Sequence, residues 1–352
     1  MNFTSDNTEI IAEPILNAIL KANKYPVKSY GEDEITKKAK EKICDLFNID
    51  AEIYFVTSGT AANALGISSV TPPYGSVFCH NESHIHLEEC GAPEFYTGGC
   101  KLIPINGFAG KISKESFASA INDYPSDKYG FKPSCLSITQ STECGTVYSE
   151  KEVTELSSLA NKHSIKVHMD GARFANAIST LKIKPSKITW ESGIDLMSFG
   201  TTKNGTMSAE AIIIFNKKIS KDMNLRIKRS GHLLSKMRFL SIQMDSYITN
   251  NLWIDLDNKA NSMAKYMYQE LLLIDYIDIP WKVEANEVFI LLPKRIEKKL
   301  IKLGIQFHKW SKIGIKPLIS NDDKEFIRLV TSYNTTKNEI DQFIAILNDI
   351  NR

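Results

Sequence analysis

Short apolar runs alternate with helical patterns over the first two thirds of the chain. Each run is long enough for one buried strand, and helical stretches such as residues 151–163 lie between several of them. Parallel strands are joined by connections of this kind, which cover both faces of the sheet with helices. The alternation therefore predicts an α/β fold whose large domain has a mostly parallel seven-stranded sheet between helices. Strands are expected at residues 53–57, 76–79, 101–105, 135–139, 165–169, 196–199 and 211–215.

The pattern changes towards the carboxyl end of the chain. Helices are expected at residues 228–248, 256–273 and 337–347, and strands near Val283 and at residues 288–292 and 327–331. We interpret this part as a smaller C-terminal α/β domain. The predicted boundaries are residues 1–250 for the large domain with its N-terminal arm and residues 251–352 for the small domain.

Composition and charge narrow the class of protein. The chain is 43% hydrophobic and 24% charged, and its formal net charge of +2 is too small to indicate nucleic acid or an anionic membrane as a partner. The apolar runs are too short to span a bilayer, and the amino terminus lacks the pattern of a signal peptide. The six cysteines form no C-x-x-C pair, so we expect reduced thiols in a cytoplasmic enzyme.

Two successive predicted strands lead to charged residues that suit one cofactor. The run Ile165–Met169 ends at Asp170, and the run Leu196–Phe199 is followed by small polar residues around Lys203. A lysine can hold pyridoxal phosphate (PLP) as a Schiff base, and a carboxylate can keep the pyridine nitrogen protonated. Alone, Asp170 could be a helix cap and Lys203 a surface lysine. Their occurrence together predicts a PLP site.

A turn of small residues after another predicted strand suits the phosphate of that cofactor. Ser58, Gly59 and Thr60 lie between the strand at residues 53–57 and a helix start. The free amides of a helix amino terminus bind anions, and Gly59 allows close approach of the backbone. The simpler interpretation is a Ser/Thr helix cap without a ligand. With Asp170 and Lys203 downstream, we favour phosphate binding.

Two further features indicate substrate and proton chemistry. Arg173 has the planar guanidinium that grips a carboxylate, although an ion pair with Asp170 is an alternative. The segment after residue 79 is rich in histidine, and His80 and His84 would chelate zinc if they lay on one helix. No complete H-E-x-x-H pattern is present. We therefore expect no metal and assign His84 to ring stacking or proton transfer at the cofactor.

Several motifs follow one another in an order typical of one family. They are Tyr30-Gly31-Glu32-Asp33, Ser58-Gly59-Thr60, Ser83-His84-Ile85-His86, His168-Met169-Asp170-Gly171-Ala172-Arg173 and Ser198-Phe199-Gly200-Thr201-Thr202-Lys203-Asn204-Gly205. With them the chain resembles the threonine aldolase family of PLP-dependent fold-type I enzymes, the β-eliminating lyase group. The resemblance covers nearly the whole chain, from Phe3 to Thr331.

The resemblance implies a role for each motif. Lys203 would be the Schiff-base lysine, Asp170 the partner of the pyridine nitrogen, and His84 the residue stacked on the ring. The substrate carboxylate would be held by Ser5, Arg173 and Arg328, and the phosphate by Ser58, Gly59 and Thr60. Members of the family form homodimers, often within a tetramer, with active sites shared between subunits. Arg229 and Arg238, with Lys228, lie in the segment from which a neighbouring chain would reach the phosphate.

The resemblance also implies a reaction, the retro-aldol cleavage of L-threonine, L-allo-threonine or a related β-hydroxy-α-amino acid to glycine and an aldehyde. The Thr-Lys-Asn-Gly motif around Lys203 resembles a bacterial low-specificity subgroup. Where many members carry a second active-site histidine, this chain has Glu143. The base that acts on the β-hydroxyl is therefore His84, Glu143 or a bound water. The alternatives are a PLP-dependent β-eliminating lyase acting on another amino acid and a PLP-binding homologue without turnover.

Overall fold

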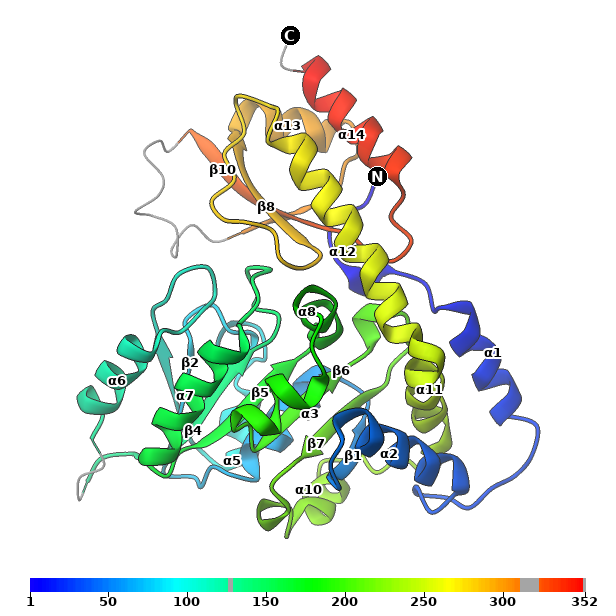
Figure 1. Ribbon diagram of the computed structural model, residues 1–352, viewed down its shortest axis with the longest axis vertical. Helices are drawn as coiled ribbons and strands as arrows, with labels where there is room; N and C mark the ends of the chain where they lie inside the picture. The colour runs from blue at the N-terminus through cyan, green and yellow to red at the C-terminus, as the bar shows by residue number, and fades with distance from the viewer. Residues whose placement is uncertain (126–128, 311–322, 351–352) are drawn as a thin grey trace.

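The computed structural model describes residues 1–125, 129–310 and 323–350 (Figure 1). In this part of the chain, seven strands form one sheet in the order β1-β7-β6-β5-β4-β2-β3. The strands are β1 (Glu52–Val56), β2 (Gly75–His80), β3 (Lys101–Ile105), β4 (Lys132–Thr139), β5 (Lys166–Gly171), β6 (Leu196–Gly200) and β7 (Glu210–Ile214). Only β7 pairs antiparallel with its neighbours, so the predicted mostly parallel sheet is confirmed.

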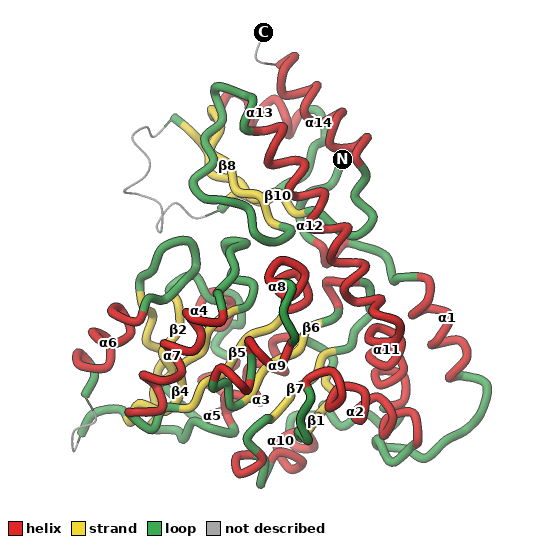
Figure 2. The backbone as a smooth tube through the Cα atoms, viewed as in Figure 1, coloured by secondary structure: helices red, strands yellow, loops and turns green. Residues whose placement is uncertain are grey.

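Helices cover both faces of this sheet. Successive side chains of each strand point to opposite faces, so one strand contributes to two cores. In β7, Ala211 and Ile213 face one hydrophobic core, and Ile212 and Ile214 face another. The first core includes α1 (Glu13–Ala22), α2 (Glu34–Phe47), α6 (Lys114–Asp123), α7 (Glu150–Lys162), α8 (Phe174–Leu181), α9 (Pro185–Ile188) and α11 (Arg238–Ile248). The helices on the second face are α3 (Gly59–Ser68), α4 (His84–Leu87) and α10 (Met223–Arg229), with the short α5 (Ala92–Thr97) packed on α3. Figure 2 shows the strands running between these helices.

A second, smaller sheet forms near the carboxyl end of the chain. Its order within the described residues is β8 (Glu287–Pro293), β10 (Lys324–Val330), β9 (His308–Lys309), and both pairings are antiparallel. It packs with α13 (Lys294–Lys302), α14 (Lys337–Ile350) and the second half of α12 (Leu252–Leu271). The first half of α12 belongs to the core of the large sheet. This long helix therefore joins the two cores, as Figure 1 shows.

Two expectations for this region are wrong. No strand forms at Val283, because the backbone next to it bonds to the large domain: Glu284 N donates to Gly145 O in the loop after β4, and Glu284 O accepts from Thr180 Oγ1 of α8. Residues 228–248 form two helices, α10 and α11, instead of one, and Gly231 in the break has a φ of +82°.

The domain boundary expected near Asn250 coincides with a sharp turn. Asn250 and Asn251 have φ values of 54° and 59°, and α12 begins at the next residue. Asparagine tolerates this left-handed conformation better than most residues do. The division at residue 250 stays a prediction.

The N-terminal arm links the two sheets. Phe3 N donates to Gln306 O, Phe3 O accepts from Val330 N, and the Phe3 ring packs on Phe343 of α14. The chain then passes the carboxyl ends of the large-sheet strands and enters α1 (Figure 1). This course brings residues 5–8 to the edge where β4, β5 and β6 end.

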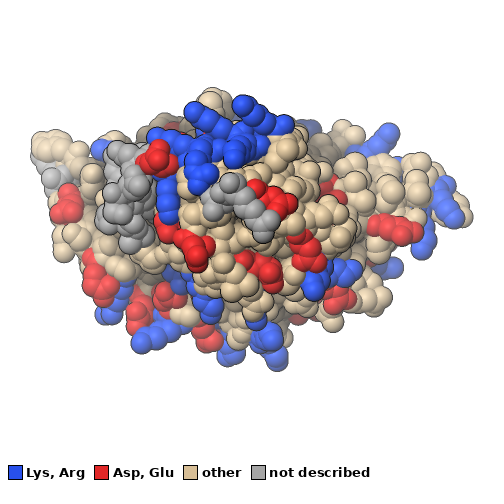
Figure 3. Space-filling model, turned by 90° about the horizontal axis from the view of Figure 1, so that it is seen from above, with Lys and Arg blue, Asp and Glu red and all other residues tan. Residues whose placement is uncertain are grey.

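The outer surface near the small sheet is charged. In α13, Ile296 and Leu300 are buried, while Arg295, Lys298, Lys299 and Lys302 are exposed. Figure 3, which views this end of the molecule, shows lysines and arginines gathered beside acidic residues. Amphipathic helices of this kind cover a core with one face and meet water with the other. Across the residues that the structure describes, no helix is both long and apolar enough to cross a membrane.

Candidate functional site

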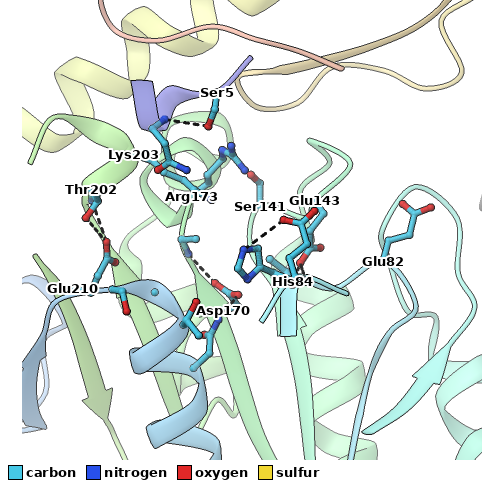
Figure 4. Close-up of a pocket in the computed structure, with 18 of the residues that line it drawn as sticks. Ser5, Glu82, His84, Ser141, Glu143, Asp170, Arg173, Thr202, Lys203 and Glu210 are labelled. Carbon is cyan, nitrogen blue, oxygen red and sulfur yellow. Dashed lines mark hydrogen bonds and ion pairs between the residues drawn. The ribbon is translucent and has the colours of Figure 1, made fainter. Parts of the chain in front are cut away.

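A cavity of about 390 Å³ lies where β4, β5 and β6 end, and residues near β9 and β10 close it from the small sheet. Ten residues singled out from the sequence line it: Ser5, Ser58, Gly59, Thr60, His84, Glu143, Asp170, Arg173, Lys203 and Arg328. Figure 4 labels Ser5, His84, Glu143, Asp170, Arg173 and Lys203. The ten residues come from segments up to 323 positions apart in the chain. In open α/β sheets, ligands bind at the carboxyl ends of parallel strands.

Lys203 lies in η3 (Thr202–Asn204), a single turn that follows β6. The neighbouring residues hold this turn: Thr202 donates to Glu210, and Asn204 donates to Tyr247, Trp253 O and Asp257. Within the described residues, Lys203 Nζ makes no hydrogen bond or ion pair. Burial and the nearby Arg173 charge lower the pKa of Lys203. A lowered pKa raises the fraction of neutral amine, the nucleophilic form.

Asp170 lies in β5 with its side chain on the same face as His168, away from the core residue Met169. Its Oδ1 accepts from Ala172 N at 3.0 Å, and its Oδ2 accepts from Asn63 Nδ2 at 2.7 Å. It does not occupy the cap position of α8, where Arg173 lies. A carboxylate has about four acceptor sites, so Asp170 can accept a further hydrogen bond from a ligand in the cavity.

Arg173 pairs with Asp6 instead of with Asp170. Its Nε and Nη2 donate to the two Asp6 oxygens at 2.8 and 3.0 Å, and its Nη1 lies 3.2 Å from Glu287 Oε1. Burial opposes ionisation of Asp6, but the charges of Arg173 and Lys203 outweigh it and lower the pKa of Asp6 to about 2. Two carboxylates that the sequence analysis missed thus hold Arg173: Asp6 takes its bidentate face, and Glu287 contacts its Nη1.

Arg328 completes this charge cluster from β10. Its Nη1 lies 3.2 Å from the same Glu287 Oε1, and its guanidinium stacks 4.6 Å from the centre of the Trp310 ring. Its Nε is buried without a hydrogen-bond partner among the described residues. Arg328 Nη2 donates to Thr4 O over a long 3.5 Å contact. Arg328 thus lines the cavity with a single carboxylate partner, whereas Arg173 has two.

The ion pairs of Arg173 predict a large effect on stability. We expect Arg173→Ala to lower the free energy of unfolding by about 3–5 kcal/mol, because it leaves two buried carboxylates without their cation. Urea unfolding of the protein at pH 7 measures this difference. Lys111→Ala, which breaks the more exposed pair with Glu152, should cost less than about 1 kcal/mol. Equal losses in the two variants would contradict a structural role for the Arg173 cluster.

His84 and Glu143 lie next to each other on the other side of the cavity (Figure 4). His84 N donates to Glu143 Oε1 at 2.8 Å, and its Nδ1 is 2.8 Å from Glu89 Oε1. The hydrogen bond to Glu89 raises the pKa of His84. Glu143 Oε1 also accepts from Thr139, whereas its Oε2 is buried without a partner among the described residues. Burial and the Asp170 charge raise the pKa of Glu143 to about 7.

The turn predicted to bind phosphate forms the amino terminus of α3. Ser58 is the helix cap, and its Oγ accepts from Ala61 N at 3.2 Å. Capping leaves the amides of Gly59 and Thr60 at the cavity, because the first amides of a helix have no partner within it. A Cβ atom built on Gly59 meets nothing within 4 Å. The cap interpretation and an anion site are therefore compatible here.

Other residues named from the sequence lie outside this cavity. Arg229 ends α10 with an exposed side chain, and Arg238 begins α11; neither lines the cavity of this chain. Their approach to the phosphate of a neighbouring subunit stays a prediction. His80 ends β2 while His84 begins α4, so the two do not share a helix. Among the described residues, no group of three or more His, Cys, Asp or Glu is placed to hold a metal.

Sequence reasoning missed Glu210, which lines the cavity below Lys203 (Figure 4). Its Oε1 accepts from both N and Oγ1 of Thr202, and burial raises its pKa to about 7. The signal was present in the sequence, since Glu210 is the one charged residue in the apolar run Ala209–Phe215. Carboxylates are almost never fully buried without a partner.

Comparisons with known proteins show which proteins this chain resembles. A family model described as beta-eliminating lyase matches residues 2–294. A low specificity L-threonine aldolase from Pseudomonas sp. (strain NCIMB 10558) is 36% identical over 327 residues, which is 93% of this chain and 94% of that protein. The structure of a threonine aldolase from Leishmania major matches with a TM-score of 0.91 at 26% identity, covering 99% of both chains.

A more distant solved structure, SPT with its PLP internal aldimine, matches with a TM-score of 0.71. It covers 99% of this chain and 86% of that one, and at 12% identity the likeness shows the fold alone, which is fold type I. The extent of the family match and of the Pseudomonas similarity identifies the family. The chain belongs to the beta-eliminating lyase family.

Proposed function

We propose that the protein is a PLP-dependent aldehyde-lyase that cleaves L-threonine, L-allo-threonine or a related β-hydroxy-α-amino acid to glycine and an aldehyde. The observation that carries the proposal is the single cavity that gathers Lys203, Asp170, the amino terminus of α3 and two arginines. The similarity to L-threonine aldolases over most of the chain supports the same activity. Release of equal amounts of aldehyde and glycine tests it.

The residues of the cavity fit PLP. The amides of Gly59 and Thr60 lie at a helix terminus with open space beside Gly59, which suits the phosphate. Lys203 has no competing partner among the described residues, and Asp170 retains free acceptor capacity. When bound, PLP supplies an aldehyde that amines can join and a ring that withdraws electrons from the substrate carbon. In this arrangement Lys203 would hold the cofactor and Asp170 its ring nitrogen.

Arg328 is the main candidate for holding the substrate carboxylate. It lines the cavity with one carboxylate partner, Glu287, and a long contact to Thr4 O, and a guanidinium binds carboxylates with two parallel hydrogen bonds. Ser5 lies nearby with its hydroxyl, which accepts from Asn7 N. Arg173, which Asp6 holds in place, adds positive charge and the N–H groups that Asp6 and Glu287 do not use. We therefore propose that Ser5, Arg173 and Arg328, which line one cavity, hold the carboxylate, with Arg328 making the larger contribution.

Glu143 is the group best placed to take the proton of the β-hydroxyl. His84 is the less suitable base because the contact with Glu89 favours its charged form, and a protonated imidazole has no free lone pair. Glu143 Oε2 is unpaired, and the pKa of Glu143 of about 7 matches a group that exchanges protons near neutral pH. Glu143 would accept the hydroxyl proton as the Cα–Cβ bond breaks, while His84 covers the cofactor.

This assignment predicts a pH dependence. A base must be ionised to act, so kcat/KM should rise about tenfold per pH unit below the Glu143 pKa of about 7 and level off above it. Glu143→Gln should lower kcat by about 10²- to 10⁴-fold and remove this acid limb. Glu82→Gln, which changes another acid lining the cavity, should keep the limb. An unchanged acid limb in Glu143→Gln would exclude Glu143 as the base.

We also propose that the protein forms a homo-oligomer. Several large apolar side chains in α1 and the segments on either side of it are exposed in the single chain: Ile10, Leu16, Leu20, Tyr25 and Val27. Exposed apolar side chains gathered in one part of a chain suit a protein interface. A tetramer, active sites shared between subunits and a cytoplasmic location stay predictions from the sequence.

A further inference from the structure

Asn63, a buried residue of α3, contacts two carboxylates at the cavity. Its Nδ2 lies 2.8 Å from Glu89 Oε1 and 2.7 Å from Asp170 Oδ2. Glu89 Oε1 is also 2.8 Å from His84 Nδ1. Asn63 therefore connects the carboxylate predicted to face the ring nitrogen with the histidine predicted to cover the ring.

The direction of these hydrogen bonds follows from the groups involved. Carboxylates only accept, so both hydrogens of the Asn63 amide point at them, and its Oδ1 faces Ser198, whose hydroxyl donates to it. Ser198 Oγ then accepts from His168 Nε2 at 3.1 Å. Burial lowers the pKa of His168 to about 4, so the ring is neutral at pH 7. Its Nδ1 therefore accepts from Ser137 Oγ at 2.9 Å.

This chain of hydrogen bonds is shielded from water. Ser137, His168, Ser198, Asn63 and Glu89 are each at most 4% exposed. Buried hydrogen bonds hold polar side chains in fixed orientations, and removing one member leaves its neighbours unpaired at low dielectric. Three strand side chains from β4, β5 and β6 thus hold the Asn63 amide in one orientation.

Glu89 depends on Asn63 more than Asp170 does. Glu89 Oε2 is buried without a partner among the described residues. Both hydrogen bonds of Glu89, from His84 and Asn63, therefore reach its Oε1. Asp170 has a second donor in Ala172 N. Loss of the Asn63 amide would leave Glu89 with His84 alone, next to the negative charge of Asp170.

We propose that Asn63 is a positioning residue, which fixes Asp170 at the ring-nitrogen position and, through Glu89, orients His84 over the cofactor. The identity of the cofactor rests on the proposed function, but the hydrogen-bond network does not. Asn63 touches neither substrate nor reacting atoms in this account. It acts by holding two groups that do.

The proposal predicts how His84 titrates. Burial raises the pKa of Glu89, whereas its hydrogen bonds from His84 and Asn63 oppose that shift. Without the Asn63 amide, Glu89 stays protonated to higher pH and no longer supports a charged His84, so the pKa of His84 falls. Three other charged groups that face His84 have no contact with Asn63: Glu88 lies 3.6 Å from its Nε2, Glu143 accepts from its backbone amide, and Lys203 lies nearby. Asp170, the fourth, loses the Asn63 hydrogen bond and keeps that from Ala172 N.

The test is an NMR titration of the His84 ring in the full-length protein, with His84→Asn to assign the signal. Asn63→Leu, of similar size without polar atoms, should lower the His84 pKa by about one unit or more and weaken PLP binding about tenfold or more, read from cofactor absorbance. Ser198→Ala, a milder change that removes the hydroxyl linking Asn63 Oδ1 to His168 Nε2 but keeps the Asn63 amide, should shift both values in the same direction by less. Ser68→Ala, on the same helix but bonded to Leu65 O and Arg226, should change neither.

Unchanged His84 titration in a folded Asn63→Leu or Ser198→Ala protein would overturn the proposal. If Asn63→Leu does not fold, Ser198→Ala alone decides. The His84 titration does not depend on turnover, so it tests the positioning role of Asn63 separately from the proposed aldolase activity. A shifted His84 in a protein that releases no aldehyde would support Asn63 as a positioning residue and count against the aldolase activity.

Discussion

Lys203→Ala is expected to reduce turnover below detection and to remove the visible absorption band of the protein mixed with PLP. Lys203 is the one lysine lining the cavity among the residues that the structure describes, and its side chain has no other partner there. No other amine in the described cavity can replace its role as a nucleophile and proton carrier. The lowered pKa of Lys203 further indicates an amine suited to reaction instead of a structural ion pair.

The measurements are steady-state aldehyde release and an absorbance titration with PLP. Lys114→Ala changes an exposed lysine at the start of α6, away from the cavity, and should leave both unchanged. Near-normal turnover of Lys203→Ala would remove the central assignment of the site. Loss of turnover with the absorption band retained would move the cofactor attachment to another lysine.

Asp170→Ala is expected to lower kcat/KM by about 10²- to 10³-fold or more, as seen when one preorganised charged or polar group is removed from a transition state. Asp170 is 3% exposed, and two hydrogen bonds fix its carboxylate at the end of β5. A fixed carboxylate at low dielectric stabilises a cationic ring nitrogen far more than water does. Asp170→Asn keeps the shape without the charge and should lose nearly as much.

The control is Asp195→Asn in the same sheet. Asp195 lies just before β6, at the opposite end from the cavity, and binds Val167 N and Lys166. Its loss should destabilise the protein but leave kcat/KM of the folded fraction within about threefold of the unchanged protein. A similar fall in both variants would mean that Asp170 acts through the fold and has no role at the cofactor.

The large sheet could be predicted because its strands are buried on both faces and appear in the sequence as continuous apolar runs. β6 and β7 lie within one or two residues of their expected positions. The same approach failed at Val283, where apolar neighbours suggested a strand but the backbone of Glu284 bonds to Gly145 and Thr180. Contacts with a distant loop and with α8 override the local pattern there.

The catalytic candidates could also be predicted, since each lies in a local motif at a strand or helix end. The residues that hydrogen-bond to these candidates could not be predicted, because they are distant in sequence. Asp6 contacts Arg173 across 167 positions, and Asn286 donates to Asp6 across 280. Nothing in the segments around Asp6 or Glu287 indicates that they converge on the two arginines. Asn63 was hidden for another reason, since it lies among small residues that suit close helix packing.

The most direct test of the proposed function is aldehyde release from L-threonine and L-allo-threonine by the purified protein supplied with PLP. We predict acetaldehyde and glycine in equal amounts, and the ratio of the two rates gives the preference at Cβ. Formation of a keto acid with ammonia, or no aldehyde from these and from bulkier β-hydroxy-α-amino acids, would contradict the aldolase and favour elimination or binding without turnover.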